Sequence, residues 1–340
     1  MNNWWLIPAL AGLSFSLTAV LRRYALSRSL LDVPNGRSSH TVPTPRGGGV
    51  AIVLSFLVAL IGLYAEALIS PGLFFALVGA GAMTAFVGFL DDHGHIAARW
   101  RLLAHFVAAI WAVWWLGGLP AITLYGASIE ISWAGHLLAV VYLVWMLNLY
   151  NFMDGIDGIA GVEAMTVCVG GCLLYWASGV QDQVWPLVLL ATCVAGFLFW
   201  NFPPAKIFMG DAGSGFLGVA LGVLSIQAAW VSPEIFWGWL ILLGVFIVDA
   251  TFTLLRRLAR GDKVYEAHRS HAYQFASRRF RRHLPVTVAV GMINVFWLLP
   301  IAFCLVYYKL DGATMLTLAY IPLILLAIKF QAGQLESDPS

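Results

Sequence analysis

Charged residues are scarce in this sequence. Of its 340 residues 61% are hydrophobic and only 11% are Asp, Glu, Lys or Arg, whereas an ordinary soluble domain carries about 25% charged residues. This scarcity argues against a water-soluble fold. Apolar stretches recur from end to end, and a stretch of about 18 residues or more is long enough to cross a hydrocarbon layer roughly 30 Å thick. We therefore predict an all-α polytopic membrane protein, with residues 1–340 forming a single transmembrane domain.

Cysteines are few as well, and several common motifs are missing. The four cysteines, Cys168, Cys172, Cys193 and Cys304, lie in apolar stretches and form no CxxC pair, so we interpret them as packing residues and expect no disulfide framework. The GxxxxGK[ST] pattern is absent, which argues against a P-loop. We find no internal repeat and no matched pair of interrupted helices. A polytopic transporter is therefore the alternative interpretation, not the leading one.

Hydropathy predicts a bundle of eleven transmembrane helices. They cover roughly residues 4–21, 48–68, 72–90, 102–117, 134–150, 159–178, 184–200, 214–230, 235–255, 286–307 and 313–330. With the N-terminus outside, every Lys and Arg except Lys309 falls on the inner side. Basic residues collect on the cytoplasmic side of membrane proteins, so we expect an outside N-terminus and a cytoplasmic C-terminus. The net charge of +2 gives no reason to expect a nucleic-acid partner.

Polar residues concentrate in the predicted inner loops. These loops cover about residues 22–47, 91–101, 151–158, 201–213 and 256–285. The outer loops are short and carry no evident chemistry. One end of the bundle is thus predicted to hold the functional site.

Adjacent carboxylates stand at the inner end of the third predicted span. Asp91 and Asp92 repel each other unless a cation or a basic group compensates their charge, and carboxylates that await a cation are typical of metal and phosphate sites. A solvated loop start is the simpler alternative, because two acids at a membrane boundary need no function.

Two more acids follow Asn151 in the segment Asn151-Phe-Met-Asp-Gly-Ile-Asp-Gly158. The spacing of Asp154 and Asp157 puts both carboxylates on one face if the segment is helical. An unpaired acid drawn into the membrane costs about 2.5 to 3.5 kcal/mol. We therefore expect the two acids to share a partner.

A glycine-rich segment, Phe208-Met-Gly-Asp-Ala-Gly-Ser-Gly215, leads directly into an apolar stretch. A helix N-terminus of this kind presents free backbone N–H groups to phosphate oxygens, and Gly213 and Ser214 belong to it. Asp211 is a candidate Mg²⁺ ligand, since Mg²⁺ usually takes one or two carboxylates together with substrate phosphates.

The longest inner loop carries His268-Arg-Ser-His271 and a basic run from Arg278 to His283. His268 and His271 flank Arg269, so two imidazoles and a guanidinium are placed to converge on one anion. The loop has too few His and Cys at ligand spacing for zinc, and we interpret Arg278, Arg279, Arg281 and Arg282 as an anchor to anionic headgroups. Asp249 is the only acid that we place deep in a span, so it needs a partner, structural or catalytic.

Three features suit the binding of a diphosphate through Mg²⁺. They are the acids at several inner helix ends, the glycine-rich helix N-terminus that can bind phosphate, and the loop that carries His and Arg. Phosphoryl transfer is the reaction class that these groups favour, because its catalysis is mainly positioning and charge neutralisation.

In these motifs the sequence resembles the polyprenyl-phosphate N-acetylhexosamine-1-phosphate transferases, of glycosyltransferase family 4 type, and the resemblance covers nearly the whole chain. The motifs that carry it are Asp32-Val-Pro-Asn-Gly-Arg-Ser-Ser-His40, Pro43-Thr-Pro-Arg-Gly-Gly-Gly49, Phe89-Leu-Asp-Asp92, Asn151 to Gly158, Phe208 to Ser214, Asp249 and the His268/His271 loop. The likeness is strongest to the bacterial O-antigen or common-polysaccharide initiating transferases.

The resemblance implies transfer of an N-acetylated sugar 1-phosphate from a UDP-sugar to undecaprenyl phosphate, with Mg²⁺, or Mn²⁺ in its place, as cofactor. It implies metal ligation by Asp211, Asp92 and Asn151. It also implies two further groups of site residues. The catalytic set is Asp91, Asp92, Asp211 and His268, and the substrate-binding set is Asn151, Asp154, Asp157, Arg46, His271, Arg269, Gly213 and Ser214.

Two departures from the family pattern bear on the substrate. Many relatives place a lysine between His40 and Pro43, where this chain has Thr41 and Val42, so Arg46 or Arg37 is expected to supply that positive charge. His-Arg-Ser-His also replaces the three consecutive histidines of the muramoyl-peptide branch, which argues against a peptidoglycan substrate. The resemblance implies a bacterial inner membrane enzyme whose site faces the cytoplasm, and it leaves the sugar and a homodimeric assembly open.

Overall fold

The computed structural model describes residues 3–34, 39, 40, 42–94, 96–263 and 268–335. Helices make up most of this part of the chain. Their bounds are η1 Asn3–Trp5, α1 Leu6–Ser27, α2 Val50–Ala65, α3 Pro71–His93, α4 Ala98–Leu116, α5 Ser132–Met153, α6 Ile159–Ala177, η2 Gln181–Gln183, α7 Trp185–Asn201, α8 Asp211–Val231, α9 Pro233–Leu242, α10 Gly244–Ala259, α11 Ala272–Phe280, α12 Leu284–Ile293, η3 Asn294–Leu298, α13 Leu299–Tyr308 and α14 Gly312–Lys329. Two short antiparallel pairs complete it, β1 Leu31–Asp32 with β2 Thr44–Pro45, and β3 Ile122–Leu124 with β4 Ala127–Ile129.

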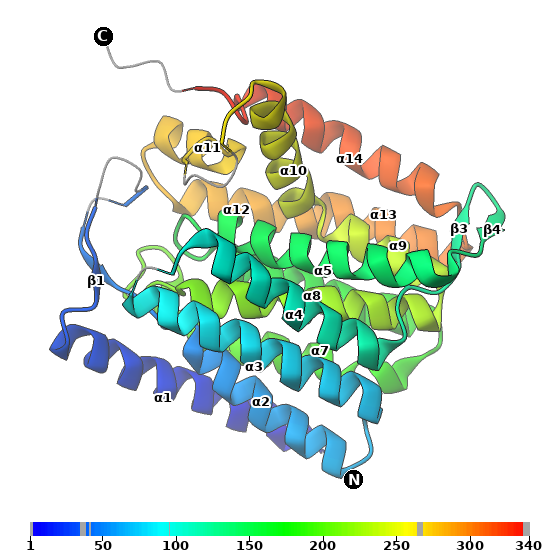
Figure 1. Cartoon of the computed structure of the whole chain (residues 1–340), viewed down its shortest axis with the longest axis horizontal. Helices are drawn as coiled ribbons and strands as arrows, with labels where there is room; N and C mark the ends of the chain where they lie inside the picture. Colours follow the sequence, from blue (N-terminus) through cyan, green and yellow to red (C-terminus); the bar gives the residue numbers. More distant parts are fainter. Residues whose placement is uncertain (1–2, 35–38, 41, 95, 264–267, 336–340) are drawn as a thin grey trace.

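Most helices run side by side along one direction (Figure 1). Within the described residues, eight helical segments are long and apolar enough to cross a membrane, and nine if the bent pair α9 and α10 counts as one span. Each of the eleven predicted spans coincides with a helix or with consecutive helices. The all-α polytopic fold is therefore confirmed, while the number of eleven crossings and their direction stay predictions.

Large apolar side chains cover the outside of the bundle. The exposed fraction is 80% for Trp114, 73% for Phe296 and 63% for Phe86. A soluble monomer rarely exposes contiguous apolar surface of this kind, so the outer surface fits a hydrocarbon environment.

Helix α8 lies at the centre of the bundle, with 83% of its apolar window buried. Its glycines let neighbouring backbones come close. A Cβ at Gly218 would lie 2.6 Å from the carbonyl oxygen of Met146 in α5, and one at Gly222 would lie 2.8 Å from Leu143. Small residues at helix contacts are typical of membrane proteins, whose helices associate through close packing. This packing fixes the position of Asp211, the first residue of α8.

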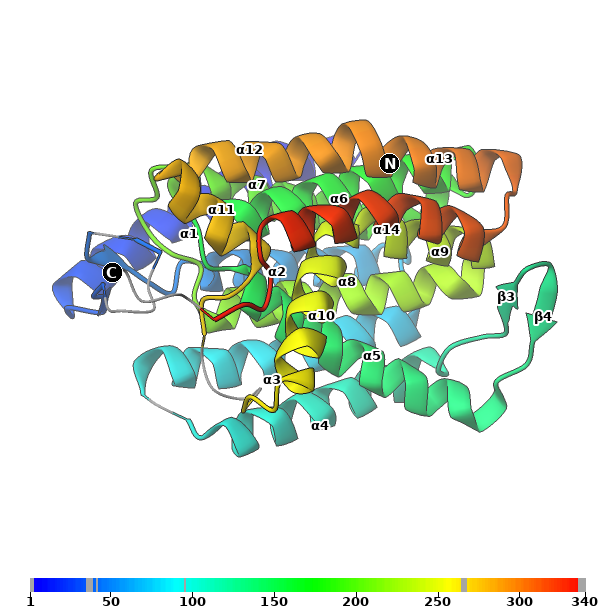
Figure 2. The same cartoon turned by 90° about the horizontal axis from the view of Figure 1, so that it is seen from above.

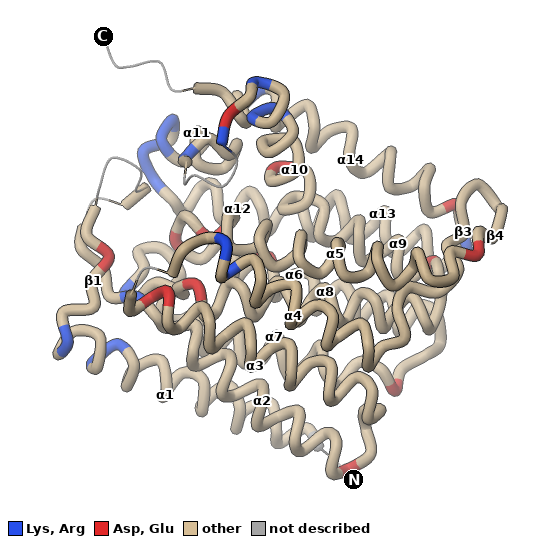
Figure 3. The backbone as a smooth tube through the Cα atoms, in the orientation of Figure 1, with Lys and Arg blue, Asp and Glu red and all other residues tan. Residues whose placement is uncertain are grey.

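A bend of 68° separates α9 from α10, so α10 runs across the main helix direction (Figure 2). The two ends of the bundle differ in charge. Most Lys and Arg gather at the end that carries β1 and α11, and the chain termini lie toward opposite ends (Figures 1 and 3). The loops with the predicted site residues meet at the basic end.

Candidate active site

A polar cavity of about 390 Å³ opens among the loops at the basic end of the bundle. We call it the acidic cavity, because four of the predicted acids line it. Its lining includes Asp92, Asp154, Asp157, Asp211, Asn151, Arg46, Ser214 and His268. Of the other predicted site residues, Asp91, Gly213, Arg269 and His271 are not part of this lining.

Asp92 holds the N-terminus of α8. Its Oδ1 accepts a hydrogen bond from the backbone N–H of Asp211 at 3.1 Å, and its Oδ2 accepts one from Ala212 at 3.3 Å. A Cβ at Gly210 would lie 2.6 Å from the same carboxylate, and Gly210 has a φ of 78°, so this position suits only glycine. Asp92 thus ties the inner end of α3 to the start of α8.

Asp91 points to a different set of partners. Its carboxylate forms an ion pair with Arg101 of α4 and accepts a hydrogen bond from the N–H of Ile96 at 2.8 Å. The same Arg101 nitrogen, Nη1, lies 3.3 Å from Oδ2 of Asp211. One guanidinium therefore bridges Asp91 and Asp211, both of which the resemblance assigns to catalysis and the second also to the metal.

Asp154 lies just beyond the end of α5 and is half-buried. Burial and the negative charges of Asp211, Asp92 and Asp157 raise the pKa of Asp154 well above its usual range. Its carboxylate has no hydrogen-bond or ion-pair partner in the described part of the chain. An acid in such surroundings favours a bound cation nearby.

The segment from Asp154 to Gly158 is a turn and not the helix that the i, i+3 spacing assumed, so the shared partner expected for the two acids is not found in the described residues. Asp157 has its own partners. Its Oδ1 lies 3.0 Å from Nδ1 of His283, and its Oδ2 accepts a hydrogen bond from the N–H of Ala205 at 3.0 Å.

The glycine-rich start of α8 packs against the loop between β2 and α2. A Cβ at Gly213 would lie 2.6 Å from Cα of Gly49, so Gly213 serves close packing here. Ser214 lines the acidic cavity and donates its hydroxyl to the carbonyl of Gly210 at 3.2 Å. Arg46 donates to the carbonyl of Asp92 and brings a positive charge to the cavity.

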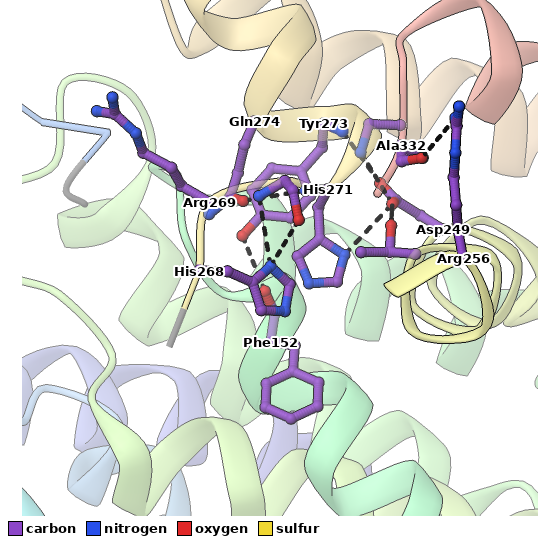
Figure 4. Close-up of polar contacts among 12 residues, drawn as sticks. Phe152, Asp249, Arg256, His268, Arg269, His271, Tyr273, Gln274 and Ala332 are labelled. Carbon is purple, nitrogen blue, oxygen red and sulfur yellow. Dashed lines mark hydrogen bonds and ion pairs between the residues drawn. The ribbon is translucent and has the colours of Figure 1, made fainter. Parts of the chain in front are cut away.

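The histidine loop presents one imidazole to the acidic cavity and buries the other (Figure 4). His268 and His271 stack with ring centroids 4.9 Å apart. Burial, together with the charges of His271 and Arg257, lowers the pKa of His268 to about 3, so His268 is neutral at pH 7. The carbonyl of Arg269 accepts a hydrogen bond from Arg278.

The partner of Asp249 is the start of α11, and its role in this structure is to hold that helix. Its carboxylate accepts hydrogen bonds from the N–H groups of Ala272 at 2.9 Å and Tyr273 at 3.0 Å, and it lies 3.3 Å from Nδ1 of His271 (Figure 4). Asp249 shares its burial inside a predicted span with a second acid. Glu163 of α6 is fully buried and accepts a hydrogen bond from Asn294 at 2.7 Å.

Two further residues of this site had no predicted role. His283, at the end of the basic run, contacts Asp157. Asn201, at the end of α7, accepts from the N–H of Gly158 and donates to the carbonyl of Ile207, at 3.0 and 2.9 Å. Its place directly before Phe-Pro-Pro was the one local signal, because a polar residue at the end of an apolar helix faces the loops.

The residues fit a divalent cation only in part. Within the described ranges no three His, Cys, Asp or Glu side chains lie close enough together to hold a metal by themselves. Mg²⁺ usually relies on one or two carboxylates and takes further oxygens from substrate phosphates and water. Asp211 and Asp154, which line the same cavity, meet that requirement, whereas Asp92 is engaged by backbone N–H groups.

Comparison with known proteins identifies the family. Residues 74–229 match the model of glycosyl transferase family 4. The "Probable undecaprenyl-phosphate N-acetylglucosaminyl 1-phosphate transferase" of Bacillus subtilis is 30% identical over 269 residues, which cover 76% of this chain and 72% of the relative. The undecaprenyl-phosphate alpha-N-acetylglucosaminyl 1-phosphate transferase of Thermotoga maritima is 27% identical, covering 84% and 86%.

A third relative comes from another branch. The phospho-N-acetylmuramoyl-pentapeptide-transferase of Bacillus pumilus is 30% identical, covering 74% of this chain and 81% of the relative. The match to both branches, on a helical membrane fold with acids gathered at one end, shows that the chain belongs to glycosyl transferase family 4, the polyprenyl-phosphate N-acetylhexosamine 1-phosphate transferases, and is a phosphotransferase.

Proposed function

We propose that this enzyme transfers an N-acetylated sugar 1-phosphate from a UDP-sugar to undecaprenyl phosphate. An oxygen of the lipid phosphate attacks the β-phosphorus of the UDP-sugar, and the bond from that phosphorus to the oxygen bridging it to the α-phosphorus breaks. UMP leaves with the bridging oxygen, and the lipid carries the sugar on a diphosphate. The bond between the sugar and its phosphate stays intact.

The observation that carries this proposal is the convergence of Asp92, Asp154, Asp157 and Asp211 on one cavity from three separate segments. Such a cavity repels a diphosphate unless a divalent cation lies between them. Mg²⁺, or Mn²⁺ in its place, would neutralise phosphate charge there. We assign its binding to Asp211, with Asn151 and Asp154 beside it, and assign to Asp92 the task of fixing Asp211.

The chain's own residues then act by position and charge. The second pKa of a phosphate monoester is about 6, so the lipid phosphate is mostly dianionic at pH 7 and needs no base. The ion pair of Asp91 with Arg101 supports an electrostatic role for Asp91. Arg46 and His268 face the same cavity, and we assign them to donor contacts, with Arg269, His271, Gly213 and Ser214 supporting the surrounding loops.

The same proposal includes the setting of the enzyme. We place residues 1–340 as one catalytic domain with eleven crossings in the bacterial inner membrane, the N-terminus outside and the site facing the cytoplasm. Within surface-polysaccharide synthesis, we assign it to the first membrane step of the O-antigen or lipopolysaccharide pathway. The positions of Lys and Arg support this orientation, since they gather at the end that holds the acidic cavity (Figure 3).

The test is a substrate panel. Purified protein is incubated with Mg²⁺, undecaprenyl phosphate and each of several UDP-sugars, including UDP-N-acetylglucosamine, UDP-N-acetylfucosamine and UDP-N-acetylquinovosamine, and the lipid product is identified by mass. We expect one or more of them to yield UMP and a lipid-linked diphosphate sugar. Turnover of none would contradict the proposal and favour a transporter.

The metal assignment has its own variant. Asp211→Asn keeps the size of the side chain but removes its charge, so we expect Mg²⁺-dependent UMP release to fall to background while the protein still inserts and folds. Near-normal turnover in Asp211→Asn would remove the metal assignment.

A further inference from the structure

His283 links two loops that are far apart in the sequence. Its Nδ1 lies 3.0 Å from the carboxylate of Asp157, and its Nε2 lies 2.9 Å from the backbone carbonyl oxygen of Ser39. The imidazole is mostly buried, with 14% of the side chain exposed. It stands directly before α12, whose Thr287 donates its hydroxyl to the carbonyl of Asp157 at 2.7 Å. The start of α12 therefore contacts Asp157 at both its side chain and its backbone.

Two oxygens face the nitrogens of this ring. A neutral imidazole has one N–H, whereas an imidazolium has two. An acceptor oxygen faces each ring nitrogen, so the doubly protonated ring can donate to both. The N–H of Asp157 also approaches Nδ1, at 3.4 Å, but the carboxylate is closer and charged. Burial lowers the pKa of His283. The hydrogen bond and negative charge of Asp157 raise it, as does the hydrogen bond to the Ser39 carbonyl, and together these outweigh burial, so the pKa of His283 lies above its ordinary value.

Both carboxylate oxygens of Asp157 take part in such contacts. One carboxylate oxygen faces His283 and the other accepts the N–H of Ala205. Ala205 belongs to the turn that leads to Phe208, and Phe208 packs edge-on against His40 with ring centroids 4.9 Å apart. The bridge thus joins α12, the loop after α5, the loop before α8 and the loop before β2.

The bridge stands between two cavities. Beside the acidic cavity lies a second cavity of about 620 Å³, which Arg278, Arg281 and Arg282 help to line. Both cavities share Ser39, His40, Asp157, Phe208 and His283 in their walls. The shape of both cavities therefore depends on this wall.

We propose that His283 is a positioning residue of the active site, which holds Asp157 and the Ser39 carbonyl together and so fixes the wall that the UDP-sugar contacts. This inference rests on the proposed function. It assigns to Asp157 an indirect role, since its oxygens hold loops in place. The acceptor lipid enters from the membrane, so its binding depends less on this wall.

The first experiment measures initial rates against each substrate for His283→Ala, His283→Gln, Asp157→Asn and the double variant His283→Ala/Asp157→Asn. His283→Ala should raise the KM for the UDP-sugar about tenfold, the scale of one charged contact, and change kcat and the KM for the lipid phosphate by less than about threefold. His283→Gln, which keeps one N–H donor, should recover part of the loss. The KM of the double variant for the UDP-sugar should not exceed that of the more impaired single variant, because each single substitution already breaks the same bridge.

The matched control is His136→Ala. His136 is exposed and lies in the first turns of α5, which follows the β3–β4 hairpin, so this variant should behave as the wild type. Additive losses in the double variant, or a loss confined to kcat, would overturn the inference. So would a His283→Ala enzyme with the wild-type KM for the UDP-sugar.

A second experiment needs no turnover. Ser39→Cys is labelled with a membrane-impermeant maleimide in inside-out vesicles, with and without His283→Ala. The four native cysteines are buried or half-buried and give a low background. Loss of the bridge should make labelling several times faster, and an unchanged rate contradicts the bridge. Faster labelling in an enzyme that turns over no UDP-sugar would keep the bridge and reject the proposed function.

Discussion

Arg101 and Asp211, one from α4 and the other from the first turn of α8, lie in ion-pair contact, with Nη1 3.3 Å from Oδ2. The same nitrogen pairs with Asp91. The guanidinium therefore offsets the repulsion between two carboxylates that the bundle brings together. A divalent cation that binds Asp211 has to share this carboxylate with Arg101 or displace it.

Arg101→Gln tests that competition. Without the guanidinium, Asp211 is more available and the local charge more negative, so the Mg²⁺ concentration that gives half-maximal UMP release should fall. Turnover should drop about tenfold to 100-fold, because the two acids lose the charged contact that fixes them. Mg²⁺ titrations of wild type, Arg101→Lys and Arg101→Gln measure both effects, with the lysine variant intermediate. A higher Mg²⁺ requirement in Arg101→Gln would mean that Arg101 does not compete for Asp211.

Asp92 and Asp211 should respond differently to substitution. Asp92→Ala removes the acceptor of two N–H groups at the start of α8, and the loss of such a cap costs about 1 to 2 kcal/mol. We expect lower thermal stability in detergent together with lost activity, whereas Asp92→Asn, which keeps one acceptor oxygen, loses less. Asp211→Asn should lose activity while its melting temperature stays equal to that of the wild type. Equal melting temperatures for Asp92→Ala and wild type would contradict the capping role.

The helices and the location of the site were readable from the sequence because both follow from local chemistry. A membrane span needs a continuous apolar stretch, and acids such as Asp92 and Asp211 avoid that stretch, so they collect at helix ends. The bend between α9 and α10 was not predicted, because hydropathy is continuous across it.

Contacts between distant segments could not be predicted from the sequence. Asp249 reaches the start of α11, 23 residues away, and His283 reaches Ser39, 244 residues away. No local pattern encodes such a pair. Glu163 is a different case, because it lies within the predicted span 159–178 and only its partner, Asn294 of the π-helical segment η3, is distant in the sequence.

A substitution at Gly213 distinguishes a packing role of this glycine from a role in phosphate binding. A Cβ there would lie 2.5 Å from Met209 and 2.6 Å from Gly49, so Gly213→Ala should destabilise the protein by about 1 to 3 kcal/mol through overpacking. Gly62→Ala in α2 is the matched control, because nothing lies within 4 Å of its Cβ, and its melting temperature should be unchanged or slightly higher. A Gly213→Ala enzyme with the wild-type melting temperature and a raised KM for the UDP-sugar would instead favour direct contact of Gly213 with a substrate phosphate.

The neutral state of His268 predicts how stability depends on pH. Its pKa is lowered to about 3 in the folded protein, first by burial and then by the charges of His271 and Arg257, whereas an unfolded histidine has a pKa of about 6.5. Between these two values the unfolded chain binds a proton that the folded chain does not. Stability contributed by this residue therefore falls as pH drops from about 6.5 toward 3.

His268→Gln should remove this sensitivity to acid, because glutamine keeps a polar side chain that does not titrate. Melting temperatures measured from pH 7.5 to 5 should fall less in His268→Gln than in wild type, by the equivalent of about 1 kcal/mol at pH 5 once solvent screening of the partly exposed ring is allowed for. If the curves of wild type and His268→Gln stay parallel over this range, His268 takes up its proton in the folded state, and a charged imidazole must then be considered in contacts with the substrate phosphates.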